Sequence, residues 1–268
     1  MLRLIYLEWS KFSKNTVLRL LIIFFMLFFP ACMYFASRIP DLPTFLPSKD
    51  TFFQFPAIWE YLGYAGNWMV FFFLGVICIY LVTIEVSNKT MRQSIINGLT
   101  RNEYFLSKLA SIFLLCLFGT ILYTILAIGV GFYNSEDVAF GEVFKNEWAI
   151  PRFFLMSVGY TLFAFFLAIL FRKSGLAIFF YLSYVMIIEP LIRLGITAKF
   201  NKASYINYFP MNATEDLMPM PAFKYADAVP RNIDFAFLLT YEQAAVTTVI
   251  YCGLFVLSAY YLFIKRDI

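Results

Sequence analysis

Long apolar runs make up most of this chain, and short polar segments separate them. Six runs come close to the roughly 20 residues that a helix needs to cross the hydrocarbon core of a membrane. They lie at residues 17–36, 64–84, 109–132, 153–171, 175–192 and 244–264. The pattern predicts an all-α integral membrane protein with six transmembrane helices, formed by a single transmembrane domain over residues 1–268. The fifth run meets Glu189-Pro190, where we expect its helix to end.

Composition agrees with a membrane protein and narrows its chemistry. Of the 268 residues, 62% are hydrophobic and 14% are charged, whereas soluble domains are about half apolar and a quarter charged. The chain contains no histidine, which excludes HExxH metalloproteases. Each of the four cysteines stands alone in an apolar run, as expected of small buried residues rather than metal ligands. We therefore expect no catalytic residues, no metal site and no cofactor.

The distribution of charge predicts the orientation. If the N-terminus is cytoplasmic, the inner segments hold 12 of the 21 Lys and Arg residues but four of the 17 Asp and Glu residues. Short cytoplasmic loops normally carry the excess of Lys and Arg. Both termini are therefore predicted to be cytoplasmic. The basic residues are scattered among loops, so nucleic acid is not an expected partner.

The segment between the fifth and sixth runs, Glu189–Gln243, is less polar than a free loop. It contains the stretches Tyr205–Met211 and Leu217–Pro221, which predict short half-helices that dip into the outer leaflet and are covered by protein. At its start, Glu189 has two interpretations. It is either an interfacial residue at a helix end, or an outer gate residue paired with Arg193.

The polar segment between the second and third runs, residues 85–108, carries four basic and two acidic residues. Thr100-x-x-Glu103 fits a capping box that starts a helix, and Gly98 fits the end of the helix before it. We expect a helix over 86–97, a turn, and a helix running into the third span. We expect the first helix to have an apolar face and a polar face. The expected apolar residues are Met91, Ile95, Ile96 and Leu99, and the expected polar residues are Lys89, Arg92 and Gln93. Such a helix is either a solvated linker or a docking site for a cytoplasmic motor.

Several short motifs, in this order and spacing, resemble the permease subunits of ABC-2 type ABC transporters. The matching residues of the polar segment are Glu85, Thr90, Arg92, Gly98, Thr100, Arg101 and Lys108. The stretch Tyr208–Ala213 followed by Leu217, and the ending Phe263–Ile268, are similar to later parts of the same family.

This resemblance implies an assembly and a place for contact with the motor. It implies two ATP-binding subunits docked on the cytoplasmic side, and a second permease subunit, either another copy or a paralogue. It also implies a multi-pass protein of a bacterial-type inner (plasma) membrane. The segment between the second and third spans becomes the amphipathic coupling helix. Its predicted docking residues are Glu85, Lys89, Arg92, Gln93, Gly98, Thr100, Arg101 and Glu103.

Two absences bear on the mechanism. The chain has no G-x-x-x-x-G-K-[ST] motif, so ATP must be bound and hydrolysed by a partner, and this chain is a transport subunit rather than an enzyme. Four of the six runs contain no charged residue, whereas ion-coupled carriers usually need one at the midplane. We therefore expect an exporter of apolar or amphipathic cargo. The alternatives are an ABC-type complex that drives a mechanical or assembly process, and an ion-coupled secondary transporter.

Overall fold

The structure, a computed structural model, describes residues 10, 12, 14–38, 49–135, 140–199, 204–221 and 238–265. Within these ranges every regular element is helical. Six helical segments are long and apolar enough to cross a membrane, which confirms the predicted fold class. They are α2 (Thr16–Ser37), α3–η2–α4 (Ile58–Met69, Val70–Leu74, Gly75–Ser87), α6 (Arg101–Asn134), α8 (Ala149–Phe171), α9–η3–α10 (Ser174–Ser183, Tyr184–Ile188, Glu189–Lys199) and α12 (Tyr241–Lys265).

Short helices occupy the connections. They are η1 (Lys49–Phe53), α5 (Thr90–Ile96), α7 (Phe140–Val143), η4 (Ser204–Tyr208) and α11 (Pro210–Glu215). The half-helices predicted between the fifth and sixth spans are thus present as η4 and α11. Residues 39–48, between the first and second spans, and residues 266–268 of the ending Phe263–Ile268 lie outside the described residues.

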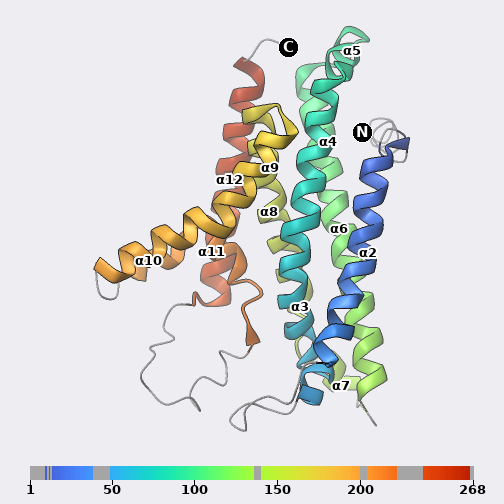
Figure 1. Ribbon diagram of the computed structural model, residues 1–268, viewed down its shortest axis with the longest axis vertical. Helices are drawn as coiled ribbons and strands as arrows, with labels where there is room; N and C mark the ends of the chain where they lie inside the picture. Colours follow the sequence, from blue (N-terminus) through green and yellow to red (C-terminus); the bar gives the residue numbers. More distant parts are fainter. Residues whose placement is uncertain are drawn as a thin grey trace.

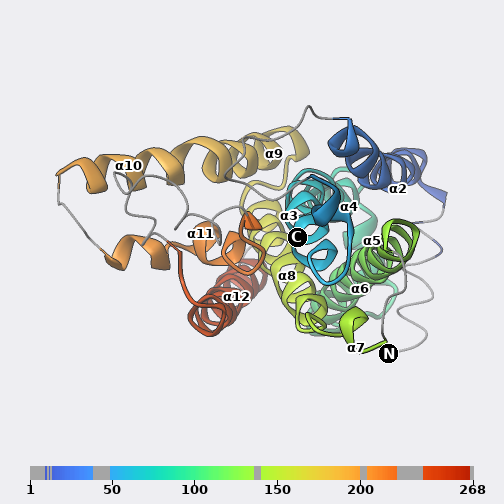
Figure 2. The ribbon, with the colours of Figure 1, turned by 90° about the horizontal axis from the view of Figure 1, so that it is seen from below.

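The fifth span corrects one prediction. We expected Glu189-Pro190 to end its helix, but the helix continues through both residues to Lys199. The turn immediately before them, η3, is π-helical. Proline lacks an N–H group and its ring clashes with the carbonyl of the preceding turn, and a π turn widens the backbone there. The span therefore continues as α10, which projects away from the bundle (Figures 1 and 2).

Helix α8 lies at the centre of the bundle, between α4, α6, α9 and α12 (Figure 2). Most of its residues are buried. The ring of Phe153 on α8 stacks on Tyr123 of α6, with 4.2 Å between the ring centroids. At Gly159 of α8, an added Cβ atom would lie 2.8 Å from the Thr214 side chain of α11 and 3.1 Å from that of Thr248 of α12. A small residue is therefore required where these three helices meet.

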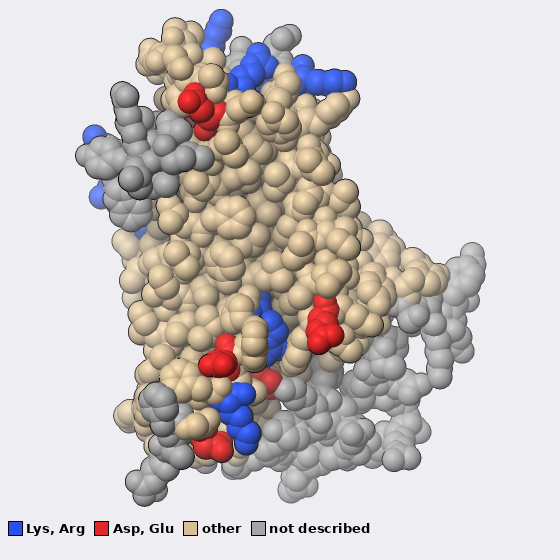
Figure 3. All heavy atoms as spheres, turned by 180° about the vertical axis from the view of Figure 1, so that it is seen from behind, with Lys and Arg blue, Asp and Glu red and all other residues tan. Residues whose placement is uncertain are grey.

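Charged side chains gather toward the two ends of the molecule. On the face seen in Figure 3, a broad uncharged band separates them. The start of α2, the end of α12 and the short helix α5 all lie at one end of the bundle (Figure 1). We call this the α5 end. The predicted outer elements η4 and α11 lie away from it, so the relative placement of the elements agrees with the predicted topology.

Candidate functional site

The coupling segment, residues 85–108, joins the second and third spans at the α5 end. Helix α4 ends at Ser87, and the chain turns at Asn88-Lys89 before α5 begins at Thr90. Lys89 adopts a left-handed backbone conformation with φ of 57°. The Thr90 hydroxyl donates to the backbone carbonyl of Glu85 across this turn, at 3.3 Å. The turn lets α5 leave the direction of α4.

This turn corrects the predicted helix over 86–97. The structure has two helices there instead of one, because Lys89 takes a conformation that no right-handed helix contains. The predicted faces also change. Met91 is buried as expected, but Ile96 is 74% exposed. With only seven residues, α5 presents one apolar side chain deeply to the bundle rather than a full apolar stripe.

The start of α6 is capped as predicted. The Thr100 hydroxyl accepts a hydrogen bond from the Glu103 backbone N–H at 3.2 Å, and the Glu103 carboxylate accepts one from the Thr100 N–H at 2.9 Å. This reciprocal pair is a capping box. Gly98 precedes it with φ of +101°, a conformation that favours glycine. The capping box and this glycine together fix the direction of α6 relative to α5.

A buried ion pair lies beneath α5. Lys108 Nζ of α6 lies 2.8 Å from Glu85 Oε1 of α4, and the two side chains are 1% and 8% exposed. The Tyr104 hydroxyl donates to the other carboxylate oxygen of Glu85 at 2.7 Å. Met91 lines a small cavity together with Tyr104 and Lys108, so α5 rests on this cluster. The pair connects α4, which comes before α5 in the chain, to α6, which comes after it.

The predicted docking residues therefore fall into two groups. Lys89, Arg92 and Gln93 are exposed on and beside α5, and we call these three the α5 polar surface. Gly98, Thr100 and Glu103 are also exposed, but they form the turn and cap. Glu85 is buried, so its side chain does not lie on this surface.

Arg101 belongs with the structural group as well. It is half-buried, and its Nη1 donates to the Ile264 carbonyl at the end of α12, at 2.7 Å. The neighbouring Asn102 accepts a hydrogen bond from the Tyr260 hydroxyl of α12 at 3.0 Å. These bonds join residues more than 150 positions apart in the sequence, so no local pattern identifies them. They tie the start of α6 to the last span.

The predicted outer gate has a different arrangement. Glu189 is 1% exposed, and its carboxylate accepts hydrogen bonds from the backbone N–H groups of Asn212 at 2.7 Å and Met211 at 3.2 Å. These groups belong to the first turn of α11, where backbone donors lack helical partners and favour negative charge. Glu189 thus fastens the half-helix to the fifth span. Arg193 lies one turn further along α10, and its pairing with Glu189 stays a prediction.

A second buried carboxylate continues this hydrogen-bond network around α11. Asp216 is 2% exposed and accepts hydrogen bonds from the Asn212 side-chain amide at 3.1 Å and from the Leu239 N–H at 3.0 Å. Burial raises the pKa of Asp216 to about 7, against the hydrogen bond from Leu239 that lowers it. Burial also raises the pKa of Glu215. The network links the fifth span, α11 and the segment that precedes α12.

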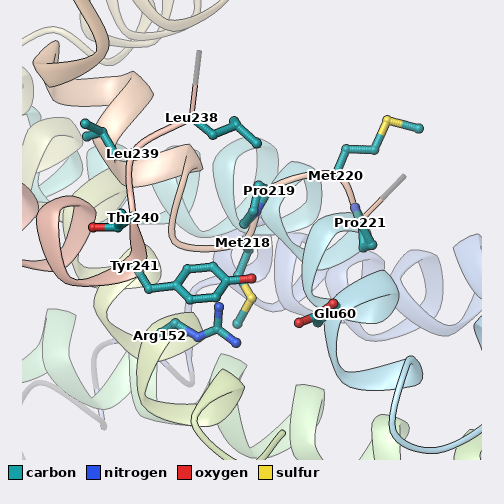
Figure 4. A pocket seen from close by; sticks show the side chains of 10 residues that line it. All are labelled: Glu60, Arg152, Met218, Pro219, Met220, Pro221, Leu238, Leu239, Thr240 and Tyr241. Atoms are coloured by element: carbon teal, nitrogen blue, oxygen red, sulfur yellow. The ribbon is translucent and has the colours of Figure 1, made fainter. Parts of the chain in front are cut away.

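Beside this network is a pocket of about 330 Å³. Figure 4 shows the Arg152 guanidinium beneath the Tyr241 ring, with Glu60 nearby and Met218 to Pro221 along one wall. The Arg152 guanidinium carbon lies 3.7 Å from the Tyr241 ring centroid, within the range of a cation–π contact. Sequence reasoning did not identify this pair, because it joins α8 to α12 across 89 positions. The contact places a positive charge in a pocket whose other lining residues are mostly apolar.

A family model described as ABC-2 family transporter protein matches residues 4–188. The match covers more than half of the chain and includes the whole coupling segment, with its turn, capping box and buried ion pair. No curated protein matches the chain.

Proposed function

Because the chain belongs to the ABC-2 family of transporter proteins, as a permease subunit of an ABC transporter, we propose that it exports apolar or amphipathic cargo. ATP hydrolysis by separate subunits drives this export, and the α5 polar surface receives the movement. In this proposal two ATP-binding subunits contact two permease subunits, the second being another copy or a paralogue. The basic residues at the α5 end favour a cytoplasmic location for that end.

The construction of the coupling segment carries the proposal. The exposed residues Arg92 and Gln93 lie on a seven-residue helix between two spans, and the exposed Lys89 immediately precedes that helix. The buried pair of Glu85 and Lys108 joins those spans directly beneath it. A partner that displaces α5 therefore acts on both spans at once, because breaking a buried ion pair is strongly unfavourable. A solvated linker needs no such support, so the arrangement favours docking.

The buried charged residues of the described spans, Glu85, Lys108 and Glu189, support an apolar cargo. Glu85 and Lys108 are paired with each other, and Glu189 binds the backbone of α11. Carboxylates that carry ions or protons through a membrane need access to water and a change of partner. These three groups already have structural partners, and the face of the molecule seen in Figure 3 carries a broad uncharged band between its two ends. This favours movement of an apolar or amphipathic molecule over ion-coupled transport.

The decisive experiment reverses the charge of the α5 polar surface. The double variant K89E/R92E is expressed with the candidate ATP-binding subunit, and co-purification and ATPase activity are measured. We expect loss of both, with the variant still inserted in the membrane. Lys145→Glu is the matched control, because Lys145 is exposed and lies beyond the opposite end of α6. Unchanged co-purification and ATPase activity of K89E/R92E would reject docking through α5.

A further inference from the structure

A second, larger hollow lies on the side of the bundle at the α5 end. It has a volume of about 380 Å³ and is formed by α2, α4 and α6, with contributions from Phe12 and Thr90. We call it the α2 groove. Its apolar lining comes from all three helices: Leu18, Ile22, Met26, Leu81, Ile84, Leu114, Leu115 and Phe118.

The groove exists because α2 stands away from α6. Along its length α2 contacts α3, η2 and α4, but few residues of α6. Leu18, Leu81 and Leu115 form a buried floor, whereas Met26 and Leu114 on the two rims are 45% and 46% exposed. The groove is therefore open on the side of the bundle, where a membrane-spanning protein faces lipid.

The two ends of the groove differ in chemistry. Toward the α5 end its lining includes Glu85, Asn88 and Thr90, and toward the middle of the span it is apolar apart from Ser111. From Leu18 to Met26 the wall formed by α2 rises about 12 Å at 1.5 Å per residue. A narrow apolar channel of this length, with one polar end at the level of a membrane interface, fits a hydrocarbon chain attached to a polar headgroup.

Three basic residues are close neighbours in sequence of the residues that line the groove toward the α5 end. Arg19 directly follows the lining residue Leu18, and Lys89 lies between the lining residues Asn88 and Thr90. Lys14 precedes the same helix, and all three bases are exposed. Negatively charged headgroups are attracted to Lys and Arg at such positions. Three polar side chains of the lining already have partners: Glu85 binds Lys108, Thr90 donates to the Glu85 carbonyl, and Ser111 donates to the Ser107 carbonyl.

We propose that the α2 groove binds one acyl chain of an anionic phospholipid from the leaflet at the α5 end. The chain lies against the floor of the groove, and the phosphate lies beside Arg19 and Lys89. If the groove were empty, its lining side chains would lose van der Waals contacts. If it were filled with water, their apolar surface would be hydrated, which is unfavourable. The bound lipid becomes part of the support of α5, because Thr90 and Glu85 belong to the same wall.

The test measures lipid retention by the purified full-length chain using native mass spectrometry. Delipidated protein is incubated with palmitoyl-oleoyl phosphatidylglycerol or with palmitoyl-oleoyl phosphatidylcholine. We expect one tightly retained phosphatidylglycerol, and about tenfold weaker retention of phosphatidylcholine. Equal retention of both lipids would reject the anionic headgroup, and retention of neither would reject lipid as the occupant.

Substitutions then locate the lipid. Leu114→Trp places a large side chain at the rim, and excluding even two methylene groups corresponds to about tenfold weaker binding. Leu117→Trp is the matched control, because Leu117 is equally exposed on α6 but does not line the groove. Met26→Trp on the facing rim provides the same test should Leu114→Trp fail to fold. The proposal would be overturned if the Leu114→Trp and Met26→Trp variants retained as much phosphatidylglycerol as the Leu117→Trp control.

The headgroup position has its own pair of variants. Arg19→Gln is expected to weaken phosphatidylglycerol retention by about fivefold. Arg38→Gln is the control, since Arg38 is an exposed arginine at the opposite end of the same helix. An equal effect of the two substitutions would show that the lipid headgroup does not lie at the α5 end.

Discussion

Lys108 of α6 and Glu85 of α4 form a buried ion pair with 2.8 Å between Nζ and Oε1. Two charges removed from water in this way are costly unless each keeps its partner. Glu85 also accepts a hydrogen bond from Tyr104, so its carboxylate has a partner on each oxygen. The pair fixes the spacing of the two spans that flank α5, which makes it central to any transfer of movement through that helix.

Removal of one partner should therefore lower the stability of the protein far more than removal of both. We expect Lys108→Met to destabilise the protein by about 3–5 kcal/mol, because it leaves the Glu85 carboxylate buried without its cation. The double variant E85Q/K108M should recover a large part of that loss. Thermal unfolding in detergent measures both. A double variant as unstable as K108M would contradict a pairwise role for the two residues.

The capping box predicts a local effect at the start of α6. Thr100→Ala removes the side-chain acceptor for the Glu103 N–H and should cost about 1 kcal/mol. Hydrogen exchange of the first amides of α6 should quicken accordingly, while amides in the middle of the span stay protected. Thr100→Ser keeps the hydroxyl and is the control. Equal exchange in the Ala and Ser variants would contradict a role for the cap.

The capping box also shows what the sequence alone was able to predict. The residue types and spacing of Thr100 and Glu103 determine a local structure, and long apolar runs determine spanning helices. Both predictions are confirmed. The Asn88-Lys89 turn and the continuation through Pro190 were missed, because each depends on a backbone conformation that its own residue types disfavour. The contact of Arg101 with Ile264 depends on the packing of α6 against α12, which no local pattern contains.

The junction of α8, α11 and α12 provides a packing prediction. Gly159→Ala puts a Cβ atom 2.8 Å from the Thr214 side chain, so the half-helix α11 or the last span must shift. We expect a lower unfolding temperature and a loss of about 1–3 kcal/mol from overpacking. Gly129→Ala is the control, since a Cβ atom there meets nothing within 4 Å and alanine favours helices. Equal unfolding temperatures for the two variants would contradict close packing at Gly159.

The hydrogen-bond network around α11 predicts a dependence of stability on pH. Burial raises the pKa of Asp216 from 3.8 to about 7 in the folded protein, so the folded state binds a proton that the unfolded state has released between these values. Stability due to this group is then fully present below about pH 4 and falls as the pH rises toward 7, where the folded carboxyl loses its proton. Above that pH the contribution is constant.

Asp216→Asn isolates this effect. Asparagine retains an oxygen that accepts from the Leu239 N–H but cannot titrate, so the fall in unfolding temperature between pH 5 and pH 7 should be smaller than in the wild type. Glu215→Gln is the comparison variant, because burial raises the pKa of Glu215 as well. This variant measures separately how much Glu215 contributes to the change of unfolding temperature with pH. Identical slopes in the wild type and Asp216→Asn would show that Asp216 releases its proton at the same pH in both states. In that case Asp216 contributes nothing to the dependence of stability on pH, and its bonds to Asn212 and Leu239 act through geometry alone.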